Sequence, residues 1–377
     1  MDNMNIQKSH CLYLTFQGIF KGDGVSKKVF AQKNAFIELG LDTTIVYPIF
    51  NDNQIIFHKE EDLFHSISFK NYNEGYKQLY NKILDFIKES SITFLYIRYC
   101  VNANSAFINF LKKCKKECSC QIFLEIPTYP YDKEFKFSSI KQIYRIFRER
   151  YYRNKLKYYI DRIVTFSTDK TIFNIPTINI SNAVDARNIP LSIKPTINDR
   201  INLIAVANIA FWHGLDRIIE GLYNYYNNPH SYQVTLTIVG NGDTNLISRL
   251  KEQVKQLNLS SYITFTGGKD GNELNELFKD KHMAIGCLGC HRKGIYEVKS
   301  LKNVEYAIRG LPFMYSENNN DFDDKEYVLK VPADDTPIKI KDICTFIIEN
   351  DFEPINLRNS VMHLTWDKQM NKITQNL

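Results

Sequence analysis

Short apolar runs alternate with helical stretches along most of this 377-residue chain, and this alternation restricts the fold more than any other feature of the sequence. In the first half, apolar runs predict strands at 10–16, 42–49, 92–99, 120–127 and 161–167. Helical patterns lie between them, such as 25–39, which ends at the stop signal Gly40. Strands that alternate with helices predict a parallel sheet with both faces covered, so the expected fold class is α/β.

The pattern starts again after 187–200, a stretch with two prolines and little periodicity. Further strands are expected at 201–208, 233–240, 262–267 and 282–288, with helices at 216–226, 247–259, 271–279 and 301–309. Because the chain is too long for one ordinary core, we predict two Rossmann-like domains. Their expected bounds are 1–184 for the first, 185–199 for a linker, 200–354 for the second, and 355–377 for a C-terminal helix that crosses back to the first. Ligands of such sheets bind beyond the carboxyl ends of the strands, so we expect the site in a cleft between the domains.

The N-terminal residues do not show a basic segment followed by a long apolar run, and no apolar run is as long as a transmembrane helix. We therefore expect a cytoplasmic protein with reduced thiols. Two groups of cysteines raise the question of a metal: Cys114, Cys118 and Cys120, and the sequence CLGCH at 287–291. The first spacing is irregular for zinc, and the second matches a haem-attachment pattern that requires export. We predict no metal and no haem, and treat the cysteines as ordinary thiols.

Positive charge is concentrated in one segment. The formal net charge is +6, yet residues 136–157 alone contain eight basic residues and one acidic residue. A nucleic-acid-binding protein would carry basic patches in several places, so we expect no nucleic-acid partner. One basic helix indicates one local role.

That helix is predicted over 138–160. Its apolar residues Ile140, Ile143, Tyr144, Phe147 and Tyr151 form a stripe that we expect to face the first domain. The basic side chains left for solvent are Arg145, Arg148, Arg153, Lys155 and Lys157. They could contact an anionic membrane surface, which would make the protein peripheral on the inner face of the plasma membrane. The alternative is a basic face that is merely solvated.

The stretch 291–312 carries the most informative polar residues. Glu297 and Glu305 are separated by seven residues, and Ser300 is a plausible N-cap for a helix that ends at Gly310. A helix N-terminus at the edge of such a sheet offers free N–H groups, which suit a phosphate, and Lys302 in the first turn adds a full charge.

Arg292 and Lys293 follow the preceding strand and are expected on the same rim. The plainer alternative is that Lys302, Glu305 and Arg309, at spacings of three and four, form surface ion pairs.

The second half of the chain resembles the family 4 retaining glycosyltransferases of the GT-B fold. Their signature is two glutamates at E-x₇-E spacing, which Glu297 and Glu305 match within SLKNVEYAIRGLPF. Other landmarks occur in the same order: ISNAVD, VANIAFWHGLDRIIEGL, VGNGD and FTGGKDGNELNELF. In the first half, LYLTFQGIFKGDGVSKK and YIRY…FLEIPTYPYDKE resemble a bacterial subgroup that builds polysaccharides. The resemblance implies sugar transfer from a nucleotide-diphosphate donor to a glycan or lipid-pyrophosphate-linked acceptor, in surface or capsular polysaccharide synthesis.

The resemblance also implies roles for individual residues. Glu305 would bind the ribose hydroxyls, Glu297 the donor sugar, and Lys302 the diphosphate. Gly267 and Gly268 would lie near the nucleobase.

In the first domain, Gly22 and Gly24 would approach the donor phosphate and the acceptor. Two departures from the family concern charge: Asn208 and His213 stand where members often carry Arg and Lys, and a histidine is only partly protonated near neutral pH. Lys302 would then need Arg292 or Lys293 to neutralise the diphosphate.

A third departure is Glu125, where many members have a histidine. It could orient the acceptor or its proton, or it could be a capping or salt-bridged carboxylate. Because breaking the anomeric bond places negative charge on the diphosphate, cations and a helix N-terminus there would suffice, and we expect neither a metal ion nor another cofactor. A nucleotide-sugar epimerase of the same fold and a non-catalytic nucleotide-sugar binder remain alternatives.

Overall fold

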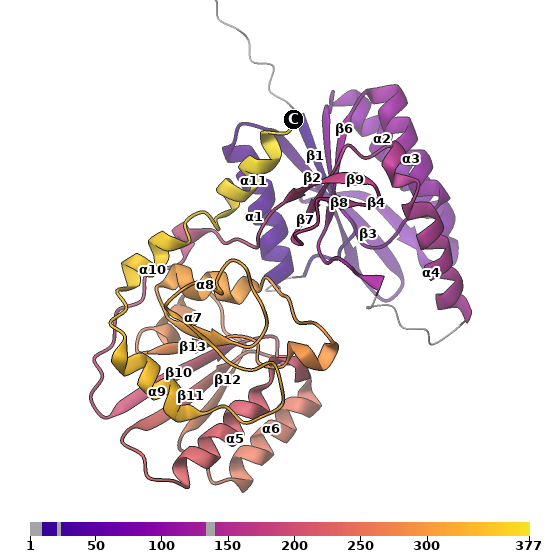
Figure 1. Ribbon diagram of the computed structural model, residues 1–377. Coiled ribbons are helices and arrows are strands. Elements are labelled where there is room, and N and C mark those ends of the chain that lie inside the picture. Colours follow the sequence, from indigo (N-terminus) through magenta and orange to yellow (C-terminus); the bar gives the residue numbers. More distant parts are fainter. Residues whose placement is uncertain (1–9, 21–23, 133–139) are drawn as a thin grey trace, which may run out of the picture. The chain divides into compact units, whose positions relative to one another are not determined.

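The computed structural model describes residues 10–20, 24–132 and 140–377, which fold into two compact α/β units (Figure 1). Unit 1 comprises the described residues up to Ser181 together with Trp366–Leu377, and unit 2 comprises Asn182–Thr365. The segment that we expected to link two domains thus belongs to unit 2. The return to unit 1 begins at Trp366, later than the expected 355, because α10 (Pro354–Ser360) packs against α8 (Leu301–Arg309) inside unit 2.

Unit 1 is built on a nine-stranded sheet in the order β4-β3-β2-β1-β5-β6-β7-β9-β8. The strands are β1 (His10–Thr15), β2 (Asp42–Phe50), β3 (Gln54–Lys59), β4 (Asp62–Ser68), β5 (Phe94–Arg98), β6 (Gln121–Ile126), β7 (Arg162–Thr165), β8 (Thr171–Ile172) and β9 (Ile175–Asn179). Strands β2, β1, β5, β6, β7 and β9 are parallel neighbours, as the alternating pattern predicts.

The antiparallel pair β3 and β4 was not predicted, because we expected only helical patterns between residues 49 and 92. Ile55, Phe57, Phe64 and Ile67 are buried between more exposed neighbours, so one face of this pair packs on the core and the other meets solvent.

The helices of unit 1 are α1 (Gly24–Glu38), α2 (Tyr72–Glu89), α3 (Ser105–Cys118), α4 (Ile140–Arg153) and α11 (Trp366–Thr374). Helices α2 and α3 lie side by side, and so do α1 and α11 (Figure 1). The C-terminal helix α11 buries Trp366, Met370 and Ile373, and Gln369 accepts a hydrogen bond from the Ser181 backbone N–H at 2.8 Å. The predicted return of the C-terminal helix to the first domain is confirmed.

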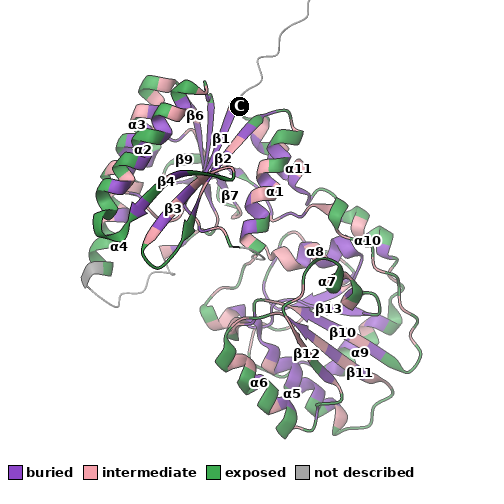
Figure 2. Ribbon diagram, turned by 180° about the vertical axis from the view of Figure 1, so that it is seen from behind, coloured by how far each residue is buried: buried purple, intermediate pink, exposed green. Residues whose placement is uncertain are grey.

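Unit 2 is built on a six-stranded parallel sheet in the order β12-β11-β10-β13-β14-β15. The strands are β10 (Arg200–Val206), β11 (Gln233–Val239), β12 (Ile263–Gly267), β13 (Met283–Ile285), β14 (Phe313–Tyr315) and β15 (Val328–Lys330). Besides α8 and α10, the helices are α5 (Leu215–Tyr226), α6 (Thr244–Gln256), α7 (Gly271–Phe278) and α9 (Ile340–Glu349). In Figure 2 the strands of this sheet are largely purple, which marks buried residues. Within the part of the chain that the structure describes, no helix is both long and apolar enough to cross a membrane.

Helix α4 buries a different face from the one predicted. Tyr144, Phe147 and Tyr151 are 66%, 65% and 59% exposed, whereas Ile146 and Glu149 are buried. The Glu149 carboxylate accepts hydrogen bonds from the hydroxyl groups of Tyr99 and Tyr131, and this polar network holds the opposite face of α4 against the rest of unit 1. The expectation that the apolar stripe faces the first domain is therefore wrong.

Candidate functional site

The polar residues expected to bind a ligand in unit 2 gather where its parallel strands end. Two short 3-10 turns follow β10 and β13: η5 (Phe211–His213) and η6 (Cys290–Lys293). Helix α8 begins shortly after η6, and its leading segment is tied to the loop after β14 by a β-bridge between Glu297 and Asn318. Because the carboxyl ends of parallel strands lie at one edge of a sheet, these loops share that edge.

In the described part of the chain, the backbone N–H groups at the N-terminus of α8 have no side-chain cap. Ser300 occupies the N-cap position, as predicted, but its side chain makes no capping hydrogen bond. The N–H groups of the first turn therefore remain available for an anion. Within the described residues, the Lys302 ammonium in this turn has no hydrogen-bond or ion-pair partner, and Glu297 on the approach to the helix is exposed.

Glu305 lies one turn later on α8 and is paired within the helix. Its Oε1 accepts two hydrogen bonds from Arg309, at 2.9 and 3.2 Å, and the buried Arg309 also donates to Asn275 at 2.9 Å. This is one of the ion pairs that the spacing had left as an alternative. Among the described residues, Oε2 of Glu305 has no hydrogen bond, so one carboxylate oxygen can still accept from a ligand.

His213 in η5 is buried and neutral. Its Nδ1 accepts a hydrogen bond from the Ala210 backbone N–H at 3.0 Å. Burial, followed by the nearby Lys302 ammonium, lowers the pKa of His213 to about 3. The expected partial positive charge is thus absent at neutral pH, and with Nδ1 as acceptor the ring proton resides on Nε2.

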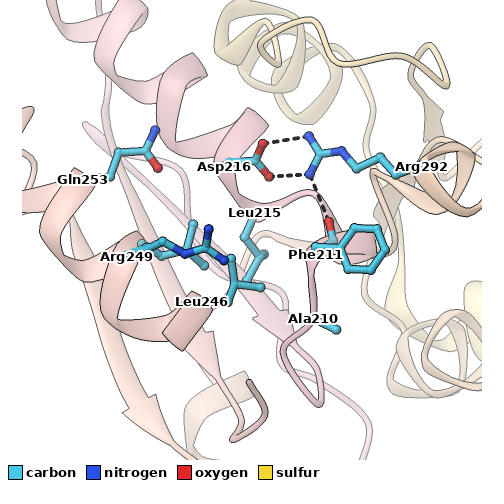
Figure 3. Close-up of a pocket in the computed structure, with 9 residues that line it drawn as sticks. Ala210, Phe211, Leu215, Asp216, Leu246, Arg249, Gln253 and Arg292 are labelled. Atoms are coloured by element: carbon cyan, nitrogen blue, oxygen red, sulfur yellow. Dashed lines mark hydrogen bonds and ion pairs between the residues drawn. The ribbon is translucent and has the colours of Figure 1, made fainter. Parts of the chain in front are cut away.

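Arg292 in η6 is engaged by carboxylates. Its guanidinium donates to both oxygens of Asp216 at 2.9 and 2.7 Å and to the Phe211 carbonyl at 2.9 Å (Figure 3). It also donates to Asp335 at 2.7 Å. The hydrogen bonds with Asp216 raise its pKa above the usual value. A pocket of about 250 Å³ lies beside this pair, next to α5 and α6, and among the predicted site residues Arg292 alone lines it.

The other two polar candidates of these loops, Lys293 and Asn208, are both exposed. The Lys293 ammonium lies 4.5 Å from the centre of the Trp212 ring, at an exposed position. Asn208 is exposed just after β10, where Ile209 bridges to Gly242. Gly242 has φ +148, and a Cβ atom there would lie 2.1 Å from the Ile209 carbonyl oxygen, so only glycine permits this approach.

The two glycines expected near a nucleobase lie at the end of β12. Gly267 has φ +72, and its carbonyl accepts from the Gly240 N–H at 2.8 Å. The Gly268 N–H donates to the Asn241 side chain at 2.9 Å. These contacts tie the β11 and β12 loops together.

Glu125 in unit 1 is fully buried and salt-bridged. It lies directly opposite Arg98 in the register of β6 and β5, and the Arg98 guanidinium donates to it. Its other oxygen accepts from Tyr96 at 2.6 Å and from Gln32 at 2.9 Å. Burial opposes ionisation, yet the charges of Arg98 and Lys28 and these hydrogen bonds keep the pKa of Glu125 below its usual value. The salt bridge of the second alternative is thus present, and a role of Glu125 toward an acceptor stays a prediction.

The remaining candidates in unit 1 are the two glycines of the first loop. Gly24 is exposed at the first residue of α1, and a Cβ atom there would meet nothing within 4 Å. Gly22 lies outside the described residues.

Three buried titratable side chains lie together in unit 2, and the sequence did not predict that they would. The Sγ atoms of Cys287 and Cys290 are 2.9 Å apart, and both lie within 4.8 Å of a carboxylate oxygen of Glu317. In the described part of the chain neither oxygen of Glu317 has a hydrogen-bond partner. Two thiols and a carboxylate are ligand types that zinc accepts, so these three residues could hold a metal ion.

The charges of this group are coupled. The hydrogen bond from Cys290 lowers the pKa of Cys287 to about 6, with a smaller contribution from Lys302. Burial, followed by the Cys287 charge, raises the pKa of Glu317 to about 8. CLGC was visible as a motif, but only folding brings Glu317, which follows another strand, beside it.

No protein-family model and no curated protein matches the chain by sequence. Solved structures do match its fold. Sucrose-phosphate synthase from Thermosynechococcus elongatus superposes with a TM-score of 0.67 at 14% identity, over 98% of this chain and 99% of that one. The apo form of the lipopolysaccharide outer core galactosyltransferase WaaB superposes with a TM-score of 0.63 at 12% identity, over 98% of this chain and 100% of that one. The complex of Anabaena HepE with UDP has the same TM-score, identity and coverage of both chains. The chain has the GT-B fold.

Within this GT-B chain, the described residues of unit 2 offer one arrangement suited to an anion at its strand ends. Lys302 supplies an unpaired positive charge, the first turn of α8 supplies N–H groups, and His213 can donate from Nε2. Such donors stabilise negative charge most when they are fixed before the ligand binds. The arrangement can therefore bind phosphate oxygens and stabilise charge that develops on them.

Proposed function

We propose that this protein is a retaining glycosyltransferase that moves a sugar from a nucleotide-diphosphate donor to a glycan or lipid-linked acceptor in bacterial surface or capsular polysaccharide synthesis. One observation carries the proposal: Lys302 and the uncapped N-terminus of α8 lie together at the carboxyl edge of a parallel sheet, inside an E-x₇-E segment. Similarity of fold to HepE, solved with UDP, and to the galactosyltransferase WaaB supports it.

In this proposal, Lys302 and the α8 N–H groups bind the diphosphate, Oε2 of Glu305 accepts from a ribose hydroxyl, and Glu297 binds the donor sugar. The nucleobase lies near Gly267 and Gly268. Departure of the diphosphate places negative charge on its oxygens, which Lys302 and the helix N-terminus stabilise without a metal ion.

In this proposal, two residues that were candidates for binding the diphosphate as cations have other roles. His213 acts as a neutral donor through Nε2, since its low pKa leaves it uncharged. Arg292 holds η6 against η5 and the start of α5 through Asp216, so Lys293 and Lys302 remain as the cations for the diphosphate.

The test is a panel of nucleotide-sugar donors screened by thermal shift, followed by assay of nucleotide release with and without a chelator. Lys302→Ala and Glu305→Ala should each reduce release by about 100-fold, while Lys279→Ala and Glu276→Ala, exposed on the surface of the same unit, serve as matched controls. A chelator should leave release unchanged. Full activity of either site variant would contradict the role given to that residue.

A second candidate is a non-catalytic nucleotide-sugar binder. The neutral His213 and the engaged Arg292 leave few cations to stabilise a leaving group, which favours this alternative. It predicts donor binding by calorimetry without release of nucleotide. An epimerase would instead convert the donor sugar in the absence of any acceptor.

The acceptor and the location belong to the same proposal. A lipid-linked acceptor would require the enzyme to work at the inner face of the plasma membrane, as a peripheral protein. Helix α4 supplies an independent reason to expect such contact.

A further inference from the structure

Helix α4 turns an apolar stripe toward solvent. The stripe consists of Ile143, Tyr144, Phe147 and Tyr151, which are 36%, 66%, 65% and 59% exposed. Their spacings of three and four residues place them on one side of the helix. Tyr158, shortly beyond the helix, is 67% exposed as well. Figure 2 shows much of α4 in green, the colour of exposed residues. A contiguous exposed aromatic surface of this kind marks an interaction site.

The opposite face of α4 is held by a specific polar network, so the stripe cannot simply rotate inward. Glu149 accepts hydrogen bonds from Tyr99 at 2.9 Å and from Tyr131 at 2.7 Å. Arg153 donates to both oxygens of Asp132, at 3.2 and 3.1 Å, and stacks over Tyr131. Rotating the helix would break these bonds and leave polar groups buried without partners, which is costly.

Basic side chains flank the stripe. Arg145 is exposed, and the Arg148 guanidinium lies 5.9 Å from the Tyr144 ring centre. Lys155 and Lys157 lie over Tyr151 and Tyr158, at 4.4 and 5.2 Å. Cations are thus interleaved with aromatic rings along this surface.

This combination favours one kind of partner. A two-fold contact with a second copy would place like charges against each other, and charged residues are depleted from the centres of protein interfaces. Tyrosine rings instead favour the boundary between water and lipid, and Lys and Arg extend toward anionic headgroups.

We propose that α4 docks unit 1 on an anionic membrane surface. In this arrangement Tyr144, Phe147 and Tyr151 enter the headgroup region, and Arg145, Arg148, Lys155 and Lys157 contact lipid phosphates. This inference stands independently of the proposed enzymatic function, because it uses neither the nucleotide site nor its residues.

The test is co-sedimentation of the full chain with vesicles of phosphatidylcholine, with and without phosphatidylglycerol. The chain should bind the anionic vesicles far more strongly. Each basic residue contributes roughly 5-fold to binding, so the triple variant Arg145→Gln/Arg148→Gln/Lys157→Gln should bind about 100-fold more weakly. Arg153 is left intact because it is part of the buried network.

The matched control removes the same charge elsewhere on unit 1: Lys70→Gln/Lys112→Gln/Lys116→Gln, all exposed. It should lose much less, because its charges belong to elements other than α4 and are not interleaved with the aromatic rings of the stripe. Phe147→Ser should weaken binding by about 10-fold with the charge unchanged, since it removes a ring that enters the membrane.

Three results would overturn the proposal. The first is that Phe147→Ser binds anionic vesicles as strongly as the wild type and that the two triple variants also bind them equally. Another is self-association without vesicles that Phe147→Ser abolishes, which would assign the surface to a second copy. The third is displacement from vesicles by single-stranded RNA at lower concentration than by soluble phosphatidylglycerol, which would assign it to nucleic acid.

Discussion

Replacing Arg98 by methionine should destabilise unit 1 strongly and in a pH-dependent way. Arg98 and Glu125 are 3% and 0% exposed and pair across β5 and β6. Without the guanidinium, the carboxylate keeps hydrogen bonds from Tyr96 and Gln32 but loses its main counter-charge. Removing one partner of a buried ion pair costs about 3–5 kcal/mol.

The sign of the pH dependence follows from Glu125. In the wild type its folded pKa is depressed, so its contribution is present above the unfolded pKa and lost as pH falls through the folded pKa. In Arg98→Met, burial prevails and the folded pKa rises above the unfolded value. The variant therefore loses stability as pH rises, and its deficit should be larger at pH 8 than at pH 5.

Urea denaturation followed by fluorescence can isolate unit 1. The chain has two tryptophans, of which Trp366 is buried in unit 1 and Trp212 belongs to unit 2. In a Trp212→Phe background, Trp366 alone reports the unfolding of unit 1. All variants are compared in that background.

The double variant Arg98→Met/Glu125→Leu provides the control. It should be more stable than Arg98→Met alone, because the uncompensated carboxylate is gone. Together with the single variant Glu125→Leu it completes a cycle that yields the coupling between the two residues. A cost below about 1 kcal/mol, or a cost that does not change between pH 5 and pH 8, would refute this reasoning.

Two further predictions concern unit 2. The folded pKa of Glu317 is raised from 4.5 to about 8, so the stability that it contributes is present at low pH and lost as pH rises through 8. Glu317→Gln resembles the protonated side chain, so its free energy of unfolding should exceed that of the wild type at pH 9 by up to about 5 kcal/mol and match it near pH 5. Urea denaturation followed by Trp212 fluorescence measures this difference. If the variant were less stable than the wild type at pH 9, the wild type would not be burying an ionised carboxylate at a cost. Arg292→Lys should lower the free energy of unfolding of unit 2 by about 1 kcal/mol, because lysine cannot bind both oxygens of Asp216 at once. The KM for the proposed nucleotide-sugar donor should stay unchanged. A raised KM with normal stability would show instead that Arg292 contacts the donor.

The strands were predictable because burial on both faces of a parallel sheet demands continuous apolar runs. β1, β5 and β6 coincide with such runs, and all their residues beyond the first of each strand are buried. The helix that carries Lys302 and Glu305 was predictable for a local reason as well, since the N-cap position of Ser300 and the stop at Gly310 lie in the sequence itself.

Other features could not be predicted, because they depend on residues far apart in the chain. Glu317 lies beside Cys287 because β13 and β14 are neighbours in the sheet. Arg292 is neutralised by Asp216, which lies at the start of a different helix. Neither pair has a signal in the local spacing.

By itself, the sequence determined the two α/β units, the alternation of most of their parallel strands with helices along the chain, and the position of a positively charged helix start, since all of these follow from local periodicity and capping. Only the tertiary structure decided which charges remain available and which face of α4 meets solvent. An amphipathic pattern predicts that the two faces of a helix differ, but it does not predict which face is buried. In α4 the buried face is determined by the partners of Glu149 and Arg153, which other elements contribute.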